Sequence, residues 1–203
     1  MATVTEPSST LWSAPATDDA ILEAMRNDLL YEVVDNQVRE LPPMGVEEGL
    51  LASTLMRILS NFAWNAGLGE VVSEILFLLI AAKKLQRRPD LAFVSFQRWP
   101  RGRRVPNSAA WEVVPNLAVE VVSPTNLANE VLERIEDYFR SGVERVWVIY
   151  PTVAKLYDYD APSSVRILTR DQTLEGGALL PGFQLPLTEL FENESSGEEV
   201  TAS

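Results

Sequence analysis

The sequence contains no cysteine and no histidine among its 203 residues. The absence of cysteine excludes a disulfide framework, a thiolate zinc site and a cysteine nucleophile. The absence of histidine excludes a serine–histidine–aspartate triad and removes the imidazole ligands of most zinc and haem sites. Any enzymatic chemistry must therefore come from carboxylates, lysine or arginine side chains, hydroxyl groups and a hard metal ion.

Long hydrophobic runs are also missing. The longest, residues 75–82, covers eight residues, whereas a membrane-spanning helix needs about 20. The first six residues carry neither a basic start nor an apolar segment, so the sequence predicts no signal peptide. We therefore expect a soluble, cytoplasmic protein that has no membrane partner.

The length and composition are typical of one globular domain with appendages, since 46% of the residues are hydrophobic and 23% are charged. Residues 1–16 are rich in Ser, Thr, Pro and Ala, and residues 192–203 are acidic. Such segments bury too little apolar surface to fold, so both are predicted to be disordered tails. The folded domain is expected to span residues 17–191.

Basic residues are concentrated in one segment of an acidic chain. The whole sequence has 17 basic and 29 acidic residues, but residues 83–104 contain eight basic residues and one acid. An acidic body repels nucleic acid, whereas a local basic segment can contact a phosphate backbone. The alternative is a solvated hairpin and loop, and charge alone favours that alternative.

The hydrophobic pattern predicts an α/β fold. Apolar spacing typical of helices occurs over residues 18–25, 46–66 and 127–140. Residues 31–41 read as a hairpin with a two-residue turn, and runs rich in β-branched and aromatic residues predict strands over 71–80, 89–95, 116–122 and 146–150. The last two strands and the helix between them should form a parallel crossover unit. We predict a mixed central sheet flanked by helices, with a β-rich C-terminal flank after residue 153.

Four acidic residues lie within or beside these apolar strands: Glu32, Glu74, Asp90 and Glu120. A charge in a buried strand is costly unless it is paired or bound to a metal. Carboxylates that converge from neighbouring strands are suitable ligands for Mg²⁺, which prefers hard oxygen donors. For each acid taken singly, a solvent-facing strand end or an ion pair with arginine is the more common explanation.

The ordered set of these segments resembles the Uma family of restriction endonuclease-like proteins, a branch of the PD-(D/E)XK nuclease superfamily. The resemblance rests on six segments that span about residues 18–191: 31–35, 88–94, 115–124, 138–143, 146–151 and 180–187. It implies a restriction-endonuclease-like core that hydrolyses DNA phosphodiester bonds with Mg²⁺ or Mn²⁺. By position, Asp90 matches the motif aspartate and Glu120 the second acid, so both are implied to be catalytic and metal-binding. Glu74 matches a further metal-binding acid and Glu32 an additional acidic site position.

One position departs from the pattern of the family. The simplest superfamily motif has Lys two residues after the second acid, where this chain has Val122. The matching cation in this family lies on the following helix, where Arg134 replaces the usual Lys. Arginine keeps the positive charge but does not readily release a proton. Arg134 is therefore a candidate catalytic residue, and an ordinary helical ion pair with Glu130 is the alternative.

Three hypotheses remain open at this point. The first is a metal-dependent endonuclease that acts on DNA, expected as a homodimer because duplex DNA offers two strands. The second is a catalytically weakened member that uses the nuclease fold as a binding or assembly module. The third is a structural protein whose apolar strands and five tryptophans serve only core and subunit contacts.

Overall fold

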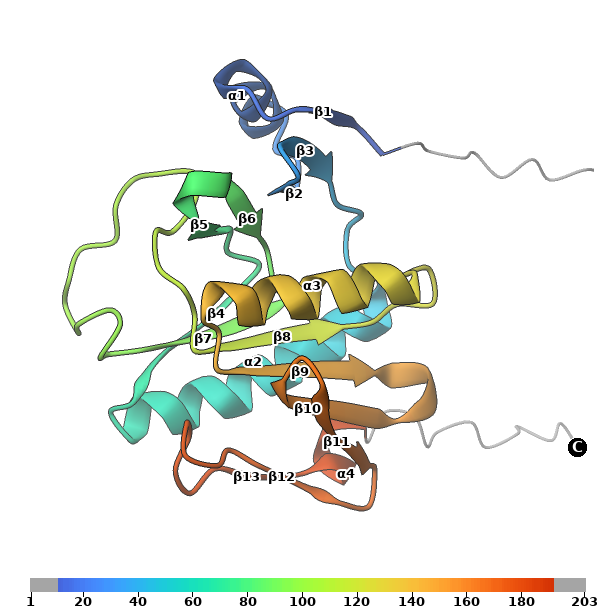
Figure 1. The fold of residues 1–203 in the computed structure, drawn as a ribbon. Helices are drawn as coiled ribbons and strands as arrows, with labels where there is room; N and C mark the ends of the chain where they lie inside the picture. The colour runs from blue at the N-terminus through green and yellow to red at the C-terminus, as the bar shows by residue number, and fades with distance from the viewer. Residues whose placement is uncertain (1–10, 192–203) are drawn as a thin grey trace, which may run out of the picture.

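The computed structural model describes residues 11–191, which form two larger sheets, one small sheet and the helices that cover them (Figure 1). The elements in chain order are β1 (Ser13–Pro15), α1 (Asp18–Arg26), β2 (Tyr31–Val34), β3 (Gln37–Glu40), α2 (Val46–Asn65), β4 (Gly69–Ser73), β5 (Phe77–Ile80), η1 (Ala81–Lys83), β6 (Leu85–Arg87), β7 (Leu91–Ser95), β8 (Leu117–Val121), α3 (Ala128–Ser141), β9 (Arg145–Tyr150), η2 (Pro151–Val153), β10 (Lys155–Ala161), β11 (Ser164–Thr169), β12 (Thr173–Glu175), β13 (Gln184–Pro186) and α4 (Leu187–Leu190). In this part of the chain no helix is long and apolar enough to cross a membrane.

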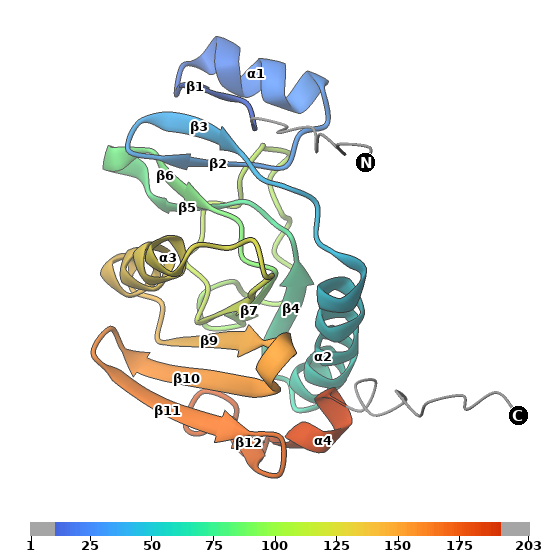
Figure 2. The same ribbon diagram turned by 90° about the vertical axis from the view of Figure 1, so that its right-hand side faces the viewer.

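The central sheet has the strand order β11-β10-β9-β8-β7-β4. Strands β8 and β9 are parallel and are joined by α3, whereas the other neighbouring pairs are antiparallel. Figure 2 shows α3 on one side of this sheet and α2 on the other. The predicted mixed sheet, its flanking helices and the parallel crossover unit are therefore confirmed.

The alternation of side chains along the strands produces one apolar layer on each face of the central sheet. On the α2 face, Leu55 and Leu59 pack with Trp147 in one buried cluster. On the α3 face, Ile135 and Tyr138 belong to a second cluster that includes Val148. Because neighbouring strand residues point to opposite faces, Trp147 and Val148 lie in different layers.

The second large sheet has the strand order β1-β3-β2-β6-β5 and carries the predicted N-terminal hairpin. Asp35 and Asn36 form its two-residue turn, and both have the positive φ values that this tight connection requires. Helix α1 begins after Thr17, whose side chain accepts a hydrogen bond from the Ala20 N–H at 3.2 Å. Figure 2 shows this sheet in the upper part of the molecule, above α3 and the central sheet.

The structure divides the predicted strand 71–80 between the two sheets. Strand β4 belongs to the central sheet and β5 to the N-terminal sheet, and residues 74–76 connect them. Glu74 has a φ of 50°, which ends β4 and redirects the chain. A run of apolar and β-branched residues predicts extended backbone, but it does not reveal a single left-handed residue within that run. Strand β6, which pairs with both β2 and β5, was likewise not predicted.

Residues 13–15, which the composition placed in a disordered tail, form a strand. Strand β1 pairs with β3 in register, so Ser13 lies opposite Arg39, and Ala16 is buried. Pairing with the edge of β3 gives the backbone of β1 its hydrogen-bond partners, and the composition of the segment alone did not predict this pairing. The rest of the predicted tails, residues 1–10 and 192–203, lies outside the described residues.

The packing of α2 against the central sheet generates a first prediction. Leu55 is fully buried on the sheet-facing side of α2, whereas Leu50 is 56% exposed. We expect Leu55→Ala to lower the free energy of unfolding by about 2–5 kcal/mol, because it leaves a cavity in the core. Leu50→Ala should lower it by less than about 1 kcal/mol. Urea denaturation of both variants measures the difference, and equal losses would contradict this assignment of the core.

Candidate active site

Three of the four candidate acids stand in a row across neighbouring strands of the central sheet. The registers place Leu91 opposite both Ser73 of β4 and Val119 of β8. One residue further along, Glu74, Asp90 and Glu120 therefore lie side by side. Two hydrogen bonds of Asp90 hold this row together: its carbonyl accepts from the Glu74 N–H at 3.1 Å, and its Oδ2 accepts from the Val121 N–H at 2.6 Å.

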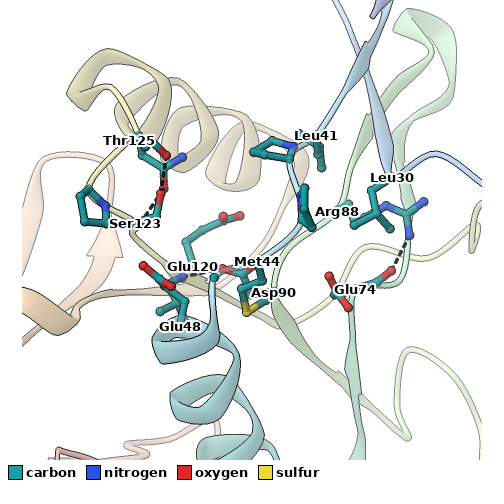
Figure 3. Close-up of a pocket in the computed structure, with 16 residues that line it drawn as sticks. Leu30, Leu41, Met44, Glu48, Glu74, Arg88, Asp90, Glu120, Ser123 and Thr125 are labelled. Atoms are coloured by element: carbon teal, nitrogen blue, oxygen red, sulfur yellow. Dashed lines mark hydrogen bonds between the residues drawn. The ribbon is translucent and has the colours of Figure 1, made fainter. Parts of the chain in front are cut away.

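The row opens into a cavity of about 320 Å³ between the N-terminal ends of α2 and α3 (Figure 3). Asp90, Glu120 and Glu74 line it together with Glu48 and Arg88. The segment from residue 123 to 126, which precedes α3, forms another part of its wall. The cavity is thus rich in carboxylates and contains one guanidinium group.

Burial opposes ionisation of the two central acids. Burial, followed by the nearby charge of Glu120, raises the pKa of Asp90 to about 8. Burial also raises the pKa of Glu120, although the Arg134 guanidinium opposes that shift. A neighbouring carboxylate adds to each shift, since Glu120 raises the pKa of Asp90 and Glu32 raises that of Glu120. Both acids are therefore held towards their neutral forms.

Arg134 lies behind Glu120 and connects it to Glu32. Its Nη1 is 2.7 Å from Glu32 Oε1 and 3.4 Å from Glu120 Oε1, and the hydroxyl of Tyr138 donates a short hydrogen bond to the same Glu120 oxygen. Glu130 does not supply the helical pair considered above, since its carboxylate instead accepts from the Leu127 N–H at 3.3 Å. Arg134 thus fixes the carboxylate of Glu120 from within the protein.

The ion pairs continue from Glu32 into the α3 face of the protein. Arg87 Nη1 is 2.9 Å from Glu32 Oε2, and its Nη2 is 2.5 Å from Asp137 Oδ2. Arg140 forms a further ion pair with Asp137 on the same helix. Burial favours the neutral form of Glu32, but Arg134 and Arg87 outweigh it and hold the pKa of Glu32 below its ordinary value. Glu32 is therefore a buried, charged, fully paired residue.

The structure separates the predicted site residues into two groups. Asp90, Glu120 and Glu74 line the cavity, whereas Glu32 and Arg134 do not. Glu74 is exposed, and within residues 11–191 no three Asp, Glu, His or Cys side chains form a cluster that could hold a metal ion. Asp90 and Glu120 therefore form a pair of carboxyls, adjacent in the strand register, that both line this cavity.

Two cavity residues were missed as site candidates in the sequence. Glu48 is buried in the first turn of α2 and contributes a further carboxylate to the wall. Arg88 is held by hydrogen bonds from its guanidinium to the backbone carbonyls of Tyr31 and Glu74, at 3.3 and 2.6 Å. Glu48 resembles an ordinary acidic helix start, and Arg88 was considered only as part of the basic segment and of the segment 88–94 that carries the family resemblance. The sequence feature that could have identified Arg88 as a site candidate is its position two residues before Asp90.

The raised pKa of Asp90 predicts a pH-dependent stability. A carboxyl whose folded pKa is raised stabilises the fold most when protonated, so this contribution is lost as the pH rises from about 4 to about 8. Asp90→Asn cannot ionise and should unfold less readily than the unsubstituted protein at pH 8.5, by about 1–3 kcal/mol. This difference in stability between the two proteins should become smaller towards pH 4. Thermal melts in a chelating buffer measure the difference, and a difference that does not change with pH would contradict the raised pKa of Asp90.

The buried position of Arg134 generates a separate prediction. Arg134→Ala leaves Glu32 and Glu120 short of a positive partner, so we expect a loss of about 3 kcal/mol or more in the free energy of unfolding. Arg140→Ala is the matched control on the same helix, because Asp137 keeps its buried pair with Arg87. The control should lose less than about 1 kcal/mol. Similar losses in both variants would show that Arg134 is an ordinary surface residue.

Comparisons with known proteins agree with this architecture. The crystal structure of a "putative nuclease belonging to DUF820" from Anabaena variabilis matches with a TM-score of 0.69 and 15% sequence identity. The match covers 80% of this chain and 89% of that chain, and at this identity it establishes the fold alone. No curated protein matches the chain.

The family comparison covers nearly all of the folded region. The model of the family Uma2, described as "Putative restriction endonuclease", matches residues 18–188, a range that includes the cavity and the ion pairs behind it. The resemblance seen in the sequence and the restriction-endonuclease-like fold are both confirmed. The chain belongs to the Uma2 family of restriction endonuclease-like proteins.

Proposed function

We propose that this protein is a metal-dependent endonuclease that hydrolyses DNA phosphodiester bonds in the cavity around Asp90 and Glu120. The observation that carries the proposal is the placement of these two carboxylates on neighbouring strands, at the wall of one open cavity. Membership of the Uma2 family supports the reaction class. The absence of cysteine and histidine leaves carboxylates as the acidic and metal-binding groups of the chain.

The residues present fit a divalent ion such as Mg²⁺ or Mn²⁺. Mg²⁺ is usually bound by one or two carboxylates together with water and substrate phosphates, so Asp90 and Glu120 would suffice as protein ligands. Burial is the main cause that raises the pKa of both carboxyls, and a divalent ion bound to them would stabilise their charged forms. Glu74 stays a predicted ligand at the exposed end of the row. A bound ion would stabilise charge on the phosphate and lower the pKa of an attacking water molecule.

Arg88 is the cation that the protein itself presents to a phosphate. Its side chain lines the cavity beside Asp90 and is fixed by two backbone carbonyls. A guanidinium has five N–H donors in a planar arrangement that suits phosphate oxygens. We assign Arg88 to binding and orienting the phosphodiester that lies next to the two carboxylates.

In this proposal Arg134 does not contact the substrate and acts through Glu120. It does not line the cavity, and its guanidinium contacts Glu120 from the protein interior. It supplies fixed positive charge and orients the Glu120 carboxylate, which an arginine does as well as a lysine. Proton transfer from water would then depend on Asp90 or Glu48 rather than on Arg134.

The substrate is proposed to be DNA, bound by a homodimer. Of the basic segment, Arg87 is buried in ion pairs, so it contributes nothing to a surface field. Arg88 and the loop arginines Arg101 and Arg103 remain around the cavities. A two-fold dimer would present two such sites to the two strands of a duplex.

A second candidate function rests on the same position of Arg134. Since no lysine lines the cavity and Arg134 faces the interior, the chain is also suited to binding DNA without cleaving it. In that case Asp90→Asn would leave the function of the protein intact. Metal-dependent turnover would rule this candidate out.

Cleavage of supercoiled plasmid DNA tests the proposed function. With Mg²⁺ or Mn²⁺ the protein is expected to nick the plasmid, and a chelator should stop the reaction. Asp90→Asn and Glu120→Gln should each lower the rate at least 100-fold, because each removes one charged ligand while keeping the side-chain shape. The nicked product is quantified on agarose gels over time.

Glu48 and Glu47 provide a matched pair of variants for the same assay. Both stand in the first turn of α2, but Glu48 is buried at the cavity and Glu47 is exposed away from it. We expect Glu48→Gln to lower the rate and Glu47→Gln to leave it within two-fold. Plasmid that stays supercoiled with either metal would overturn the proposal.

A further inference from the structure

A second cavity adjoins the candidate active site on the far side of Arg88 and Glu74. It has a volume of about 400 Å³, and these two residues line both cavities. The long connection between β7 and β8 encloses it, and this loop contributes most of the wall, from residue 96 to residue 111. A molecule that occupied both cavities would therefore pass directly over Arg88.

The chemistry of this second cavity differs from that of the first. Its wall is mainly apolar and aromatic, and includes Val72, Ile75, Leu76, Phe96, Trp99 and Val105. Trp99 packs edge-on against Trp111, with ring centroids 5.3 Å apart. Flat aromatic side chains and aliphatic groups of this kind suit a planar, uncharged ring rather than a phosphate.

Arginine side chains cover the aromatic rings at the rim of the cavity. The guanidinium of Arg103 lies 4.0 Å from the centroid of the Trp99 ring, and that of Arg101 lies 4.1 Å from the Trp64 ring. Both arginines line the cavity, and Trp99 does so as well, whereas Trp64 lies outside it. Alternating aromatic and arginine groups are typical of surfaces that stack nucleobases and contact the backbone between them.

From these observations we infer that the second cavity binds an unpaired nucleobase of the DNA strand whose phosphodiester lies at Asp90 and Glu120. The inference rests on the proposed function, and it assigns the cavity beneath residues 96–111 to the nucleotide next to the scissile phosphate. Arg88, which is common to both cavities, would contact the phosphate between them. A base inside a duplex would have to leave the stack to enter, so single-stranded or locally opened DNA is the favoured substrate.

Binding measured without metal tests the inference independently of cleavage. The probes are two fluorescein-labelled 12-mers, one of thymidylate and one with the same backbone but abasic at every position. Fluorescence anisotropy in a chelating buffer gives the dissociation constant for each. The full-length protein should bind the thymidylate probe at least about five-fold more tightly, since stacking is worth about 1–3 kcal/mol per base.

Two pairs of variants distinguish base binding in the second cavity from general effects on the affinity for DNA. Trp99→Leu should abolish the preference for bases, and Trp64→Leu, which removes a similar tryptophan–arginine contact outside the cavity, should keep it. Ser108→Leu narrows the cavity at an exposed wall residue and should also abolish the preference. Ser163→Leu, an exposed position in the turn between β10 and β11, is its control.

The outcomes distinguish this inference from the proposed function. Equal affinity of the unsubstituted protein for both probes would overturn the inference, even if plasmid cleavage is observed. An equal loss of affinity for both probes in Trp99→Leu and Ser108→Leu would also overturn the inference, because only contacts with the DNA backbone would then be affected. A base preference that depends on Trp99 and Ser108 would support the cavity assignment even in a protein that cleaves nothing.

Discussion

The buried ion pairs that run from Glu120 through Arg134 to Glu32 constrain the whole active-site end of the molecule. They join the central sheet, α3 and the N-terminal sheet, and Arg87 and Asp137 extend them into the protein. Charges of this kind are tolerated in a protein interior only when each has its partner in place. The N-terminal hairpin and α3 must therefore dock together before Glu120 has a defined orientation. Everything that we infer about the cavity depends on that orientation.

The acids of the site are distinguished by their partners rather than by their sequence neighbours. Glu32 and Glu120 are both buried in strands, yet arginines hold the pKa of Glu32 below its ordinary value, whereas burial leaves that of Glu120 raised. Glu32 is consequently a structural anion. Asp90 and Glu120 instead have raised pKa values and line the cavity, where a bound cation would stabilise their charged forms. The same residue type thus serves two purposes in one small region.

Arg134 and Arg88 differ in their position relative to the cavity. Arg134 contacts both Glu32 and Glu120 through one nitrogen, Nη1, and does not line the cavity. Arg88 then becomes the cation that faces solvent, and it stands where the acidic cavity and the aromatic cavity meet. A cavity lined by carboxylates and a mainly apolar, aromatic cavity are therefore adjacent, and the proposed binding of a nucleotide strand requires this arrangement.

The sequence by itself determined the three longer helices, most strands and the parallel crossover unit, because these depend on local periodicity. It also singled out Asp90 and Glu120 as candidates, because these acids lie in or beside apolar strands. It did not reveal that Glu74 turns the chain between two sheets, that residues 13–15 pair with β3, or that Glu48 and Arg88 reach the cavity. Only the tertiary structure decided which charges neutralise one another: Glu32 and Arg134 are 102 residues apart, and no local pattern records such a contact. Ion pairs and cavity walls are formed by several segments that are distant in the sequence. For this reason only the folded protein shows which charged residues form buried ion pairs and which line the cavity.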